Sequence, residues 1–136
     1  MRLPKLRQRM EDSLEGMEPE EVVSNYSRGA EFERRVGHDI ESYGYKWVRS
    51  SGSHKPADLV ALRDGEVVAI QCKRDGRLAP QEWNKFLDWC EAAGATPVLA
   101  SKGPRGSGII YSRLTSRKDG RGRQPLESWT PQIEGY

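Results

Sequence analysis

The chain has 136 residues, of which 35% are hydrophobic and 31% are charged, and a formal net charge of +2. Its length suits one domain with a modest core, and four tryptophans argue against a wholly disordered chain. No apolar run approaches the roughly 18 residues of a membrane-spanning helix, no secretory signal is present, and two cysteines are too few for a disulfide framework or a zinc site. We therefore expect a soluble, cytoplasmic protein with no membrane partner.

Residues 1–27 are rich in charged residues, with basic residues first and acidic residues after them, and they show no sustained apolar face. This pattern predicts an N-terminal arm that is either flexible or contains short helices over residues 5–15 and 19–25. Those short helices are also one candidate for a surface that packs on a partner subunit.

A first long helix is predicted over residues 27–42. Ser27 can cap its start, apolar residues then recur at spacings of four, four and three, and Gly44 suits the position just past its end. Glu33 borders the apolar stripe of this helix, close enough to lean over a sheet packed beneath it. Glu31 lies further round the helix and is expected to face solvent.

A strand over residues 45–49, a loop of turn residues and a β-hairpin follow this helix. Two short apolar runs, residues 59–62 and 67–70, flank the pair Asp64-Gly65, which suits a two-residue type I′ turn. This turn fixes which residues of the two strands face one another.

Polar residues gather at the open end of the predicted hairpin. Counting outward from the turn places Asp58, the start of the second strand, opposite Gln71, and Lys73 lies on the same face because strand side chains alternate. A carboxylate, an amide and an ammonium thus share the end of an otherwise apolar face. The pattern indicates a site, and a merely solvated hairpin end is the alternative.

A second helix is predicted to begin at Pro80, which suits a first helical turn, and to stop at Gly94. Two strands, over residues 97–100 and 108–114, come after it. The resulting order α-β-β-β-α-β-β predicts an α/β fold with a mixed central sheet flanked by helices. The expected core-facing residues of the second helix are Trp83, Phe86, Leu87, Cys90 and Ala93.

The segment from residue 102 to residue 123 is strongly basic, with seven Lys or Arg against one Asp, and it contains five glycines. Basic, glycine-rich loops suit the phosphate backbone of nucleic acids, which they contact without reading bases. We therefore expect a nucleic-acid partner rather than a small-molecule substrate, with a solvated charge run as the alternative. Residues 116–136 are predicted to be a basic C-terminal tail.

The residues that carry these features resemble a known nuclease family. An Asp, a hairpin and then x-x-Lys, with a Glu on the preceding helix, resembles the PD-(D/E)xK nuclease superfamily. More narrowly, the segments 29–34, 48–53, 58–61 and 93–100 resemble the archaeal-type Holliday junction resolvases. The likeness covers about residues 28–114, implies a restriction-endonuclease-like fold and places a nuclease domain at residues 28–115.

The resemblance implies a catalytic site whose metal ligands are Glu33, Asp58 and Gln71, with Lys73 beside them and Ser53 contributed by the preceding loop. The implied metal is Mg²⁺, with Mn²⁺ as a substitute. Gln71 departs from the family, which usually has Glu there; its amide oxygen can still ligate Mg²⁺ but brings no charge. The expected DNA-contacting residues are Arg28, Arg34, Arg49, Lys55, Arg74, Arg77, Lys102 and Arg105.

The same resemblance implies a homodimer that binds a four-way DNA junction in recombination and repair and nicks two opposed strands. Two alternatives stay open from the sequence. One is another PD-(D/E)xK nuclease that cuts duplex or branched DNA, and the other is a junction-binding protein without catalytic activity. The substitution at position 71 is what opens the second alternative.

Overall fold

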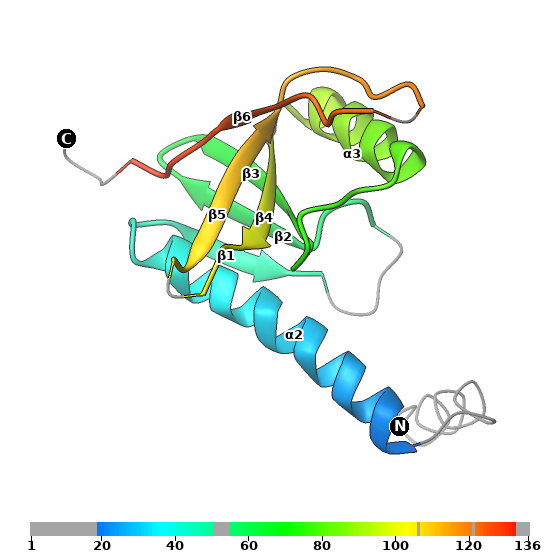
Figure 1. The fold of residues 1–136 in the computed structure, drawn as a ribbon. Helices are drawn as coiled ribbons and strands as arrows, with labels where there is room; N and C mark the ends of the chain where they lie inside the picture. Colours follow the sequence, from blue (N-terminus) through cyan, green and yellow to red (C-terminus); the bar gives the residue numbers. More distant parts are fainter. Residues whose placement is uncertain (1–18, 51–54, 106, 121, 133–136) are drawn as a thin grey trace, which may run out of the picture. The chain divides into compact units, whose positions relative to one another are not determined.

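The computed structural model describes residues 19–50, 55–105, 107–120 and 122–132, with side chains from residue 28 onward. The chain divides into two units, Met1–Glu31 and Phe32–Tyr136. The described part of the first unit is the beginning of helix α2 (Pro19–Glu41), and the second unit holds the rest of that helix and all the strands (Figure 1). Within the described ranges, no helix is long and apolar enough to cross a membrane.

Helix α2 begins earlier than the sequence pattern predicts. It is continuous from Pro19, so Ser27 is not its cap and residues 19–25 do not form a separate short helix. Pro19 favours a first helical turn, and the two glutamates that follow it complement the helix dipole there. The end is as predicted: Gly44 has a φ of 94° and donates its N–H to the Glu41 carbonyl at 2.9 Å. The helix predicted over residues 5–15 lies outside the described residues.

The six strands form one mixed sheet in the order β1-β2-β3-β4-β5-β6. The one parallel pair among them is β3 with β4, because helix α3 (Pro80–Ala93) makes the crossover between these two strands. This arrangement confirms the predicted α/β class with a mixed sheet. The strands are β1 (Lys46–Arg49), β2 (Leu59–Arg63), β3 (Glu66–Cys72), β4 (Thr96–Lys102), β5 (Ile109–Leu114) and β6 (Leu126–Ser128).

The β2–β3 hairpin has the predicted turn. Asp64 and Gly65 have φ angles of 46° and 80°, as a type I′ turn requires, and Arg63 pairs with Glu66 across them. Only the open end differs from the prediction.

The regular pairing ends at Leu59 and Ile70, so the expected partnership of Asp58 with Gln71 is not part of the ladder. The N–H of Asp58 instead donates to the Ile70 carbonyl at 2.9 Å. Asp58 and Leu59 together therefore oppose one residue, which is the arrangement of a β-bulge.

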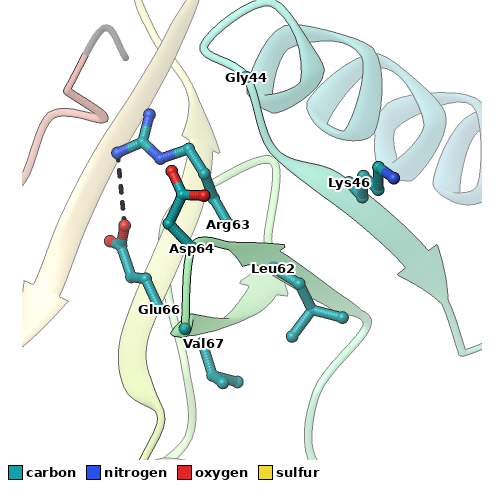
Figure 2. A pocket seen from close by; sticks show the side chains of 8 residues that line it. Gly44, Lys46, Leu62, Arg63, Asp64, Glu66 and Val67 are labelled. Carbon is teal, nitrogen blue, oxygen red and sulfur yellow. Dashed lines mark hydrogen bonds and ion pairs between the residues drawn. The ribbon is translucent and has the colours of Figure 1, made fainter. Parts of the chain in front are cut away.

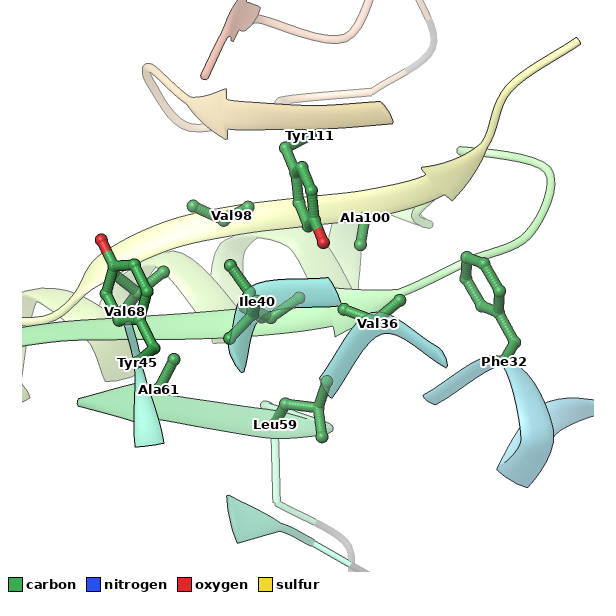
Figure 3. Close-up of a cluster of buried hydrophobic side chains, with 11 residues drawn as sticks. Phe32, Val36, Ile40, Tyr45, Leu59, Ala61, Val68, Val98, Ala100 and Tyr111 are labelled. Carbon is green, nitrogen blue, oxygen red and sulfur yellow. The ribbon is translucent and has the colours of Figure 1, made fainter. Parts of the chain in front are cut away.

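The two helices cover opposite faces of the sheet, because alternate residues of β3 and β4 point to opposite sides. Val68, Ile70, Val98 and Ala100 belong to the cluster under α2, which Figure 3 shows packed around Val36 and Ile40. The intervening residues Ala69 and Leu99 pack under α3, against Trp83, Phe86, Leu87 and Cys90. Ala93 was predicted to face this core, but it is exposed, because it is the last residue of the helix.

The segment after β5 packs back onto the domain. It forms β6, which pairs with β5, and Trp83 donates its indole N–H to the Ser116 carbonyl at 2.8 Å. Asn84 and the backbone of Lys118 exchange two hydrogen bonds, of 2.9 and 2.8 Å. The sequence did not predict β6, since its charged and glycine-rich surroundings show no apolar periodicity. The domain boundaries proposed at residues 27 and 115 stay a prediction.

Candidate functional site

One edge of the sheet collects the ends of several strands. Because β1, β3 and β4 run in the same direction, their carboxyl ends meet there, beside the start of β2. Backbone hydrogen bonds join these ends: Lys73 N–H donates to the Ala100 carbonyl at 2.9 Å and Lys102 N–H to the Arg74 carbonyl at 3.1 Å. The polar end of the predicted hairpin therefore lies at the edge where β1, β3 and β4 end.

A hollow of about 330 Å³ opens at this edge. Three of the predicted site residues, Asp58, Gln71 and Lys73, line it together. The remaining lining residues are Lys55, Pro56, Glu82 and Lys85. The structure thus gathers a carboxylate, an amide and an ammonium in one hollow, as predicted by counting residues outward from the hairpin turn.

Asp58 is held by the bulge that ends the ladder. Its Oδ2 accepts the backbone N–H of Cys72 at 2.9 Å. Burial raises the pKa of the Asp58 carboxyl, and the hydrogen bond from Cys72 opposes this effect. The negative charges of Glu33 and Glu82 raise the pKa further, whereas the positive charge of Lys73 lowers it. Burial is therefore the main reason that the ionised form of Asp58 is disfavoured.

Gln71 is the buried polar residue of the site, with 9% of its surface exposed. Its Nε2 donates to the carbonyl of Pro56. Because a carbonyl can only accept, this bond fixes the orientation of the amide. Oε1 is therefore the polar atom of Gln71 that can bind a group in the hollow.

Glu33 reaches this edge from helix α2. Its Oε2 accepts a hydrogen bond from Nε of Arg49 at 2.6 Å, and both side chains are 19% exposed. The charge of Glu33 acts on Asp58, since it contributes to the raised pKa of that carboxyl. Glu33 does not line the hollow itself, so it stands beside the Asp58 group, held by the guanidinium of Arg49.

Lys73 faces a carboxylate that the sequence analysis did not single out. Its Nζ lies 3.3 Å from Oε2 of Glu82, on the first turn of α3, and the two side chains are 36% and 52% exposed. Lys85 lines the hollow one helical turn further on. The signal for both was present in the sequence: each directly precedes a core residue of α3, so they share one flank of that helix.

A second, larger hollow of about 490 Å³ lies at the other end of the hairpin, around its turn (Figure 2). Arg63 and Glu66 form an ion pair of 3.3 Å there, and Tyr45 donates its hydroxyl to Glu66 at 2.8 Å. No predicted site residue lines this hollow. Two of its charged groups, Arg63 and Glu66, already bind one another, and none of the predicted site residues lies there, so we place the candidate site at the Asp58 edge.

Most of the basic residues predicted to contact DNA are exposed. Arg49 is half-buried against Glu33, Lys55 lines the hollow, and Arg28 lies in the first unit. Ser53, the predicted contribution of the loop, lies outside the described residues. The exposed residues of the second unit in this set are Arg34, Lys55, Arg74, Arg77, Lys102 and Arg105.

Comparison with known families places this chain. Residues 24–122 match the family model described as archaeal Holliday junction resolvase (Hjc). The chain belongs to this family. All the described candidate residues, from Arg28 to Arg105 in the sequence, fall inside the matched range.

Individual members of the resolvase family support the match. The chain is 35% identical over 81 residues to the crossover junction endodeoxyribonuclease Hjc of Methanocaldococcus jannaschii, a match that covers 57% of this chain and 60% of the relative's length. A solved structure of Archaeoglobus fulgidus Hjc, described as a Holliday junction resolvase from an archaeal hyperthermophile, aligns with a TM-score of 0.52 at 25% identity. That alignment covers 60% of this chain and 72% of the other.

Proposed function

We propose that this protein is a structure-selective, metal-dependent endonuclease that resolves four-way DNA junctions by paired nicks. The observation that carries the proposal is the hollow that gathers Asp58, Gln71 and Lys73 at the basic edge of the sheet, in a member of the resolvase family. The names of its relatives, a crossover junction endodeoxyribonuclease and a Holliday junction resolvase, agree with this reaction. We place this activity in DNA recombination and repair, in the cytoplasm.

The donor atoms of the site fit a hard divalent cation. Asp58 and Glu33 offer carboxylate oxygens and Gln71 offers an amide oxygen, which are the ligand types that Mg²⁺ and Mn²⁺ accept. In the described parts of the chain, no three His, Cys, Asp or Glu side chains converge on one point. Mg²⁺ keeps several of its waters and needs only one or two carboxylates from a protein. When bound, the cation would polarise the scissile phosphate and acidify a water.

The protein's own cations would act on the phosphate. Lys73 lies beside the carboxylates, and its ammonium can orient an attacking water or offset charge that develops on the phosphate. Lys55 and Lys85 line the same hollow and would hold the strand in place. Asp58, whose burial raises its pKa, gains a positive partner when a cation and DNA are both present.

The partner we propose is branched DNA bound by a homodimer. A four-way junction is nearly two-fold symmetric, so two copies of one site, related by a dyad, would cut opposed strands alike. The basic side chains around the hollow, among them Arg74 and Lys102, supply contacts to the backbone rather than to bases.

Gln71 favours a second candidate, a junction-binding protein without cleavage. The amide brings no negative charge to the cation, and its NH₂ is tied to the Pro56 carbonyl. Such a protein would bind junctions tightly but leave both strands intact. A nuclease that cuts linear duplex equally well is the third outcome.

Cleavage of an end-labelled four-way junction tests the proposal. The reaction contains Mg²⁺ or Mn²⁺, with a linear duplex of the same sequence and the Asp58→Asn variant as controls. Paired nicks near the crossover, absent on the duplex and in the variant, are the expected result. Tight binding without nicks would establish the binding protein, and full cleavage by Asp58→Asn would remove Asp58 from the reaction.

A further inference from the structure

The hollow at the Asp58 edge is poor in negative charge. Three lysines line it, Lys55, Lys73 and Lys85, whereas Gln71 contributes only a neutral amide. Asp58 is one lining carboxylate, and Glu82 is the other. A divalent cation attracted to this place therefore depends on the few carboxylates that face it.

Glu82 and Asp58 come from different elements but act on the same space. Glu82 stands on the first turn of α3, and Asp58 on the bulge before β2. Both carboxylates line the same hollow, so a cation next to Asp58 would also be attracted by Glu82.

The present partner of Glu82 does not hold it firmly. Its ion pair with Lys73, at 3.3 Å, is between side chains that are 52% and 36% exposed. Ion pairs this open to water contribute little free energy, so the Glu82 side chain can reorient at small cost. Gln71 cannot compensate in the same way, because it is 9% exposed and its NH₂ is bound to Pro56.

We infer that Glu82 is a further cation-binding residue of the proposed active site, and that its carboxylate supplies from α3 the negative charge that the amide of Gln71 lacks. This inference rests on the proposed metal-dependent function. Glu82 lines the hollow from α3, a different element from the strand end that carries Asp58, and would support the cation through a bound water.

Cation binding measured without cleavage tests this role. Mn²⁺ is titrated into the full-length protein, alone and with junction DNA built from non-hydrolysable backbone linkages, by calorimetry and by the electron paramagnetic resonance signal of free Mn²⁺. The variants are Glu82→Gln, Asp58→Asn, Gln71→Glu and the double variant Gln71→Glu/Glu82→Gln. Asp88→Asn is the matched control, because Asp88 is on the same helix but pairs with Arg117 away from the hollow.

We expect Glu82→Gln to weaken Mn²⁺ binding about 10- to 100-fold, the range typical of groups that support metal ligands indirectly. Asp88→Asn should leave the affinity unchanged, and Gln71→Glu should return the Glu82→Gln variant toward the wild-type affinity. That rescue would show that the Glu82→Gln protein still folds and that the negative charge of the hollow sets the affinity.

The remaining outcomes separate the two proposals. If Asp58→Asn abolishes Mn²⁺ binding while Glu82→Gln keeps the full affinity, this inference is wrong and the proposed site stands. If Asp58→Asn binds Mn²⁺ as the wild type does, or if the wild type binds none with or without DNA, the proposed metal site fails and this inference fails with it.

Discussion

The carboxylate of Asp58 accepts the backbone N–H of Cys72 at 2.9 Å, just beyond the last regular pair of the β2–β3 ladder. The bulge frees the Cys72 N–H from strand pairing, and the side chain of Asp58 takes the place of the missing backbone acceptor. The Oδ2 atom of Asp58 is therefore held by this hydrogen bond, and Oδ1 can bind a group in the hollow. This contact fixes the position of the Asp58 carboxylate at the open end of the hairpin.

Asp58 should make the metal-free protein less stable. A pKa raised in the folded state means that the folded protein holds the proton more tightly than the unfolded chain does. The stabilisation is present below the ordinary pKa of Asp and is lost as the pH rises through the raised value. At a pH above the raised pKa, the half-buried carboxylate therefore lowers the free energy of unfolding.

We expect Asp58→Asn to raise the free energy of unfolding at pH 7 by about 1 kcal/mol, the scale of a typical single substitution. The gain should shrink as the pH falls below the raised pKa. Thermal unfolding in EDTA at several pH values measures it, and added Mg²⁺ should stabilise the wild type but not the variant. Asp88→Asn, which removes an exposed partner of Arg117, is the control and should show no gain. A lower melting temperature for Asp58→Asn at pH 7 would contradict this account.

Much of the candidate site could be predicted from local features of the sequence. Asp64-Gly65 fixed the hairpin register by its turn type, so the closeness of Asp58, Gln71 and Lys73 could be predicted by counting. The bulge could not be predicted, because it depends on a contact between the Asp58 side chain and the backbone N–H of Cys72. This contact lies at the open end of the hairpin, far from the turn.

The contribution of α3 to the site required tertiary information. The crossover between β3 and β4 determines which flank of α3 lies over the sheet edge, and periodicity alone gives only the buried stripe. Glu82 and Lys85 border that stripe, as many charged residues do on solvated helices. Strand β6 was missed for a related reason: three residues beside charged turns pair with β5 without a pattern of their own.

The Glu33–Arg49 pair should couple stability to cation binding. At 2.6 Å, with each side chain 19% exposed, it is partly shielded from water. Arg49→Met leaves the Glu33 carboxylate without its guanidinium, and we expect a loss of about 1–3 kcal/mol in the free energy of unfolding. Urea unfolding measures this, and the Glu33→Gln/Arg49→Met double variant should recover part of the loss. Mg²⁺ should stabilise Arg49→Met more than the wild type. Equal stabilisation would show that Glu33 does not interact with the cation.

Two glycines of α2 should respond to alanine with opposite signs. A Cβ on Gly37 would come within 2.6 Å of ring atoms of Trp47 on β1, so the ring must shift. We expect Gly37→Ala to cost about 1–3 kcal/mol through overpacking, which outweighs the helix propensity of alanine. Gly29 is the matched control: no described atom lies within 4 Å of an added Cβ, so Gly29→Ala should stabilise the helix by up to about 1 kcal/mol. Chemical denaturation compares the two, and a stabilising Gly37→Ala would show that Trp47 yields without cost.

The basic edge of the sheet should set the salt dependence of DNA binding. Arg74 and Lys102 are exposed neighbours there, joined by a backbone hydrogen bond of 3.1 Å between β4 and the loop after β3. If each contacts a phosphate, Arg74→Ala and Lys102→Ala should each reduce the slope of log K against log salt concentration by about 1. Fluorescence anisotropy on a four-way junction at several salt concentrations, in EDTA to prevent cleavage, measures the slope. Arg113→Ala is the control, since Arg113 on β5 already pairs with Glu127 at 2.5 Å and should leave the slope unchanged. Unchanged slopes for both edge variants would show that the DNA backbone does not reach this edge, and would move the proposed junction surface elsewhere on the protein.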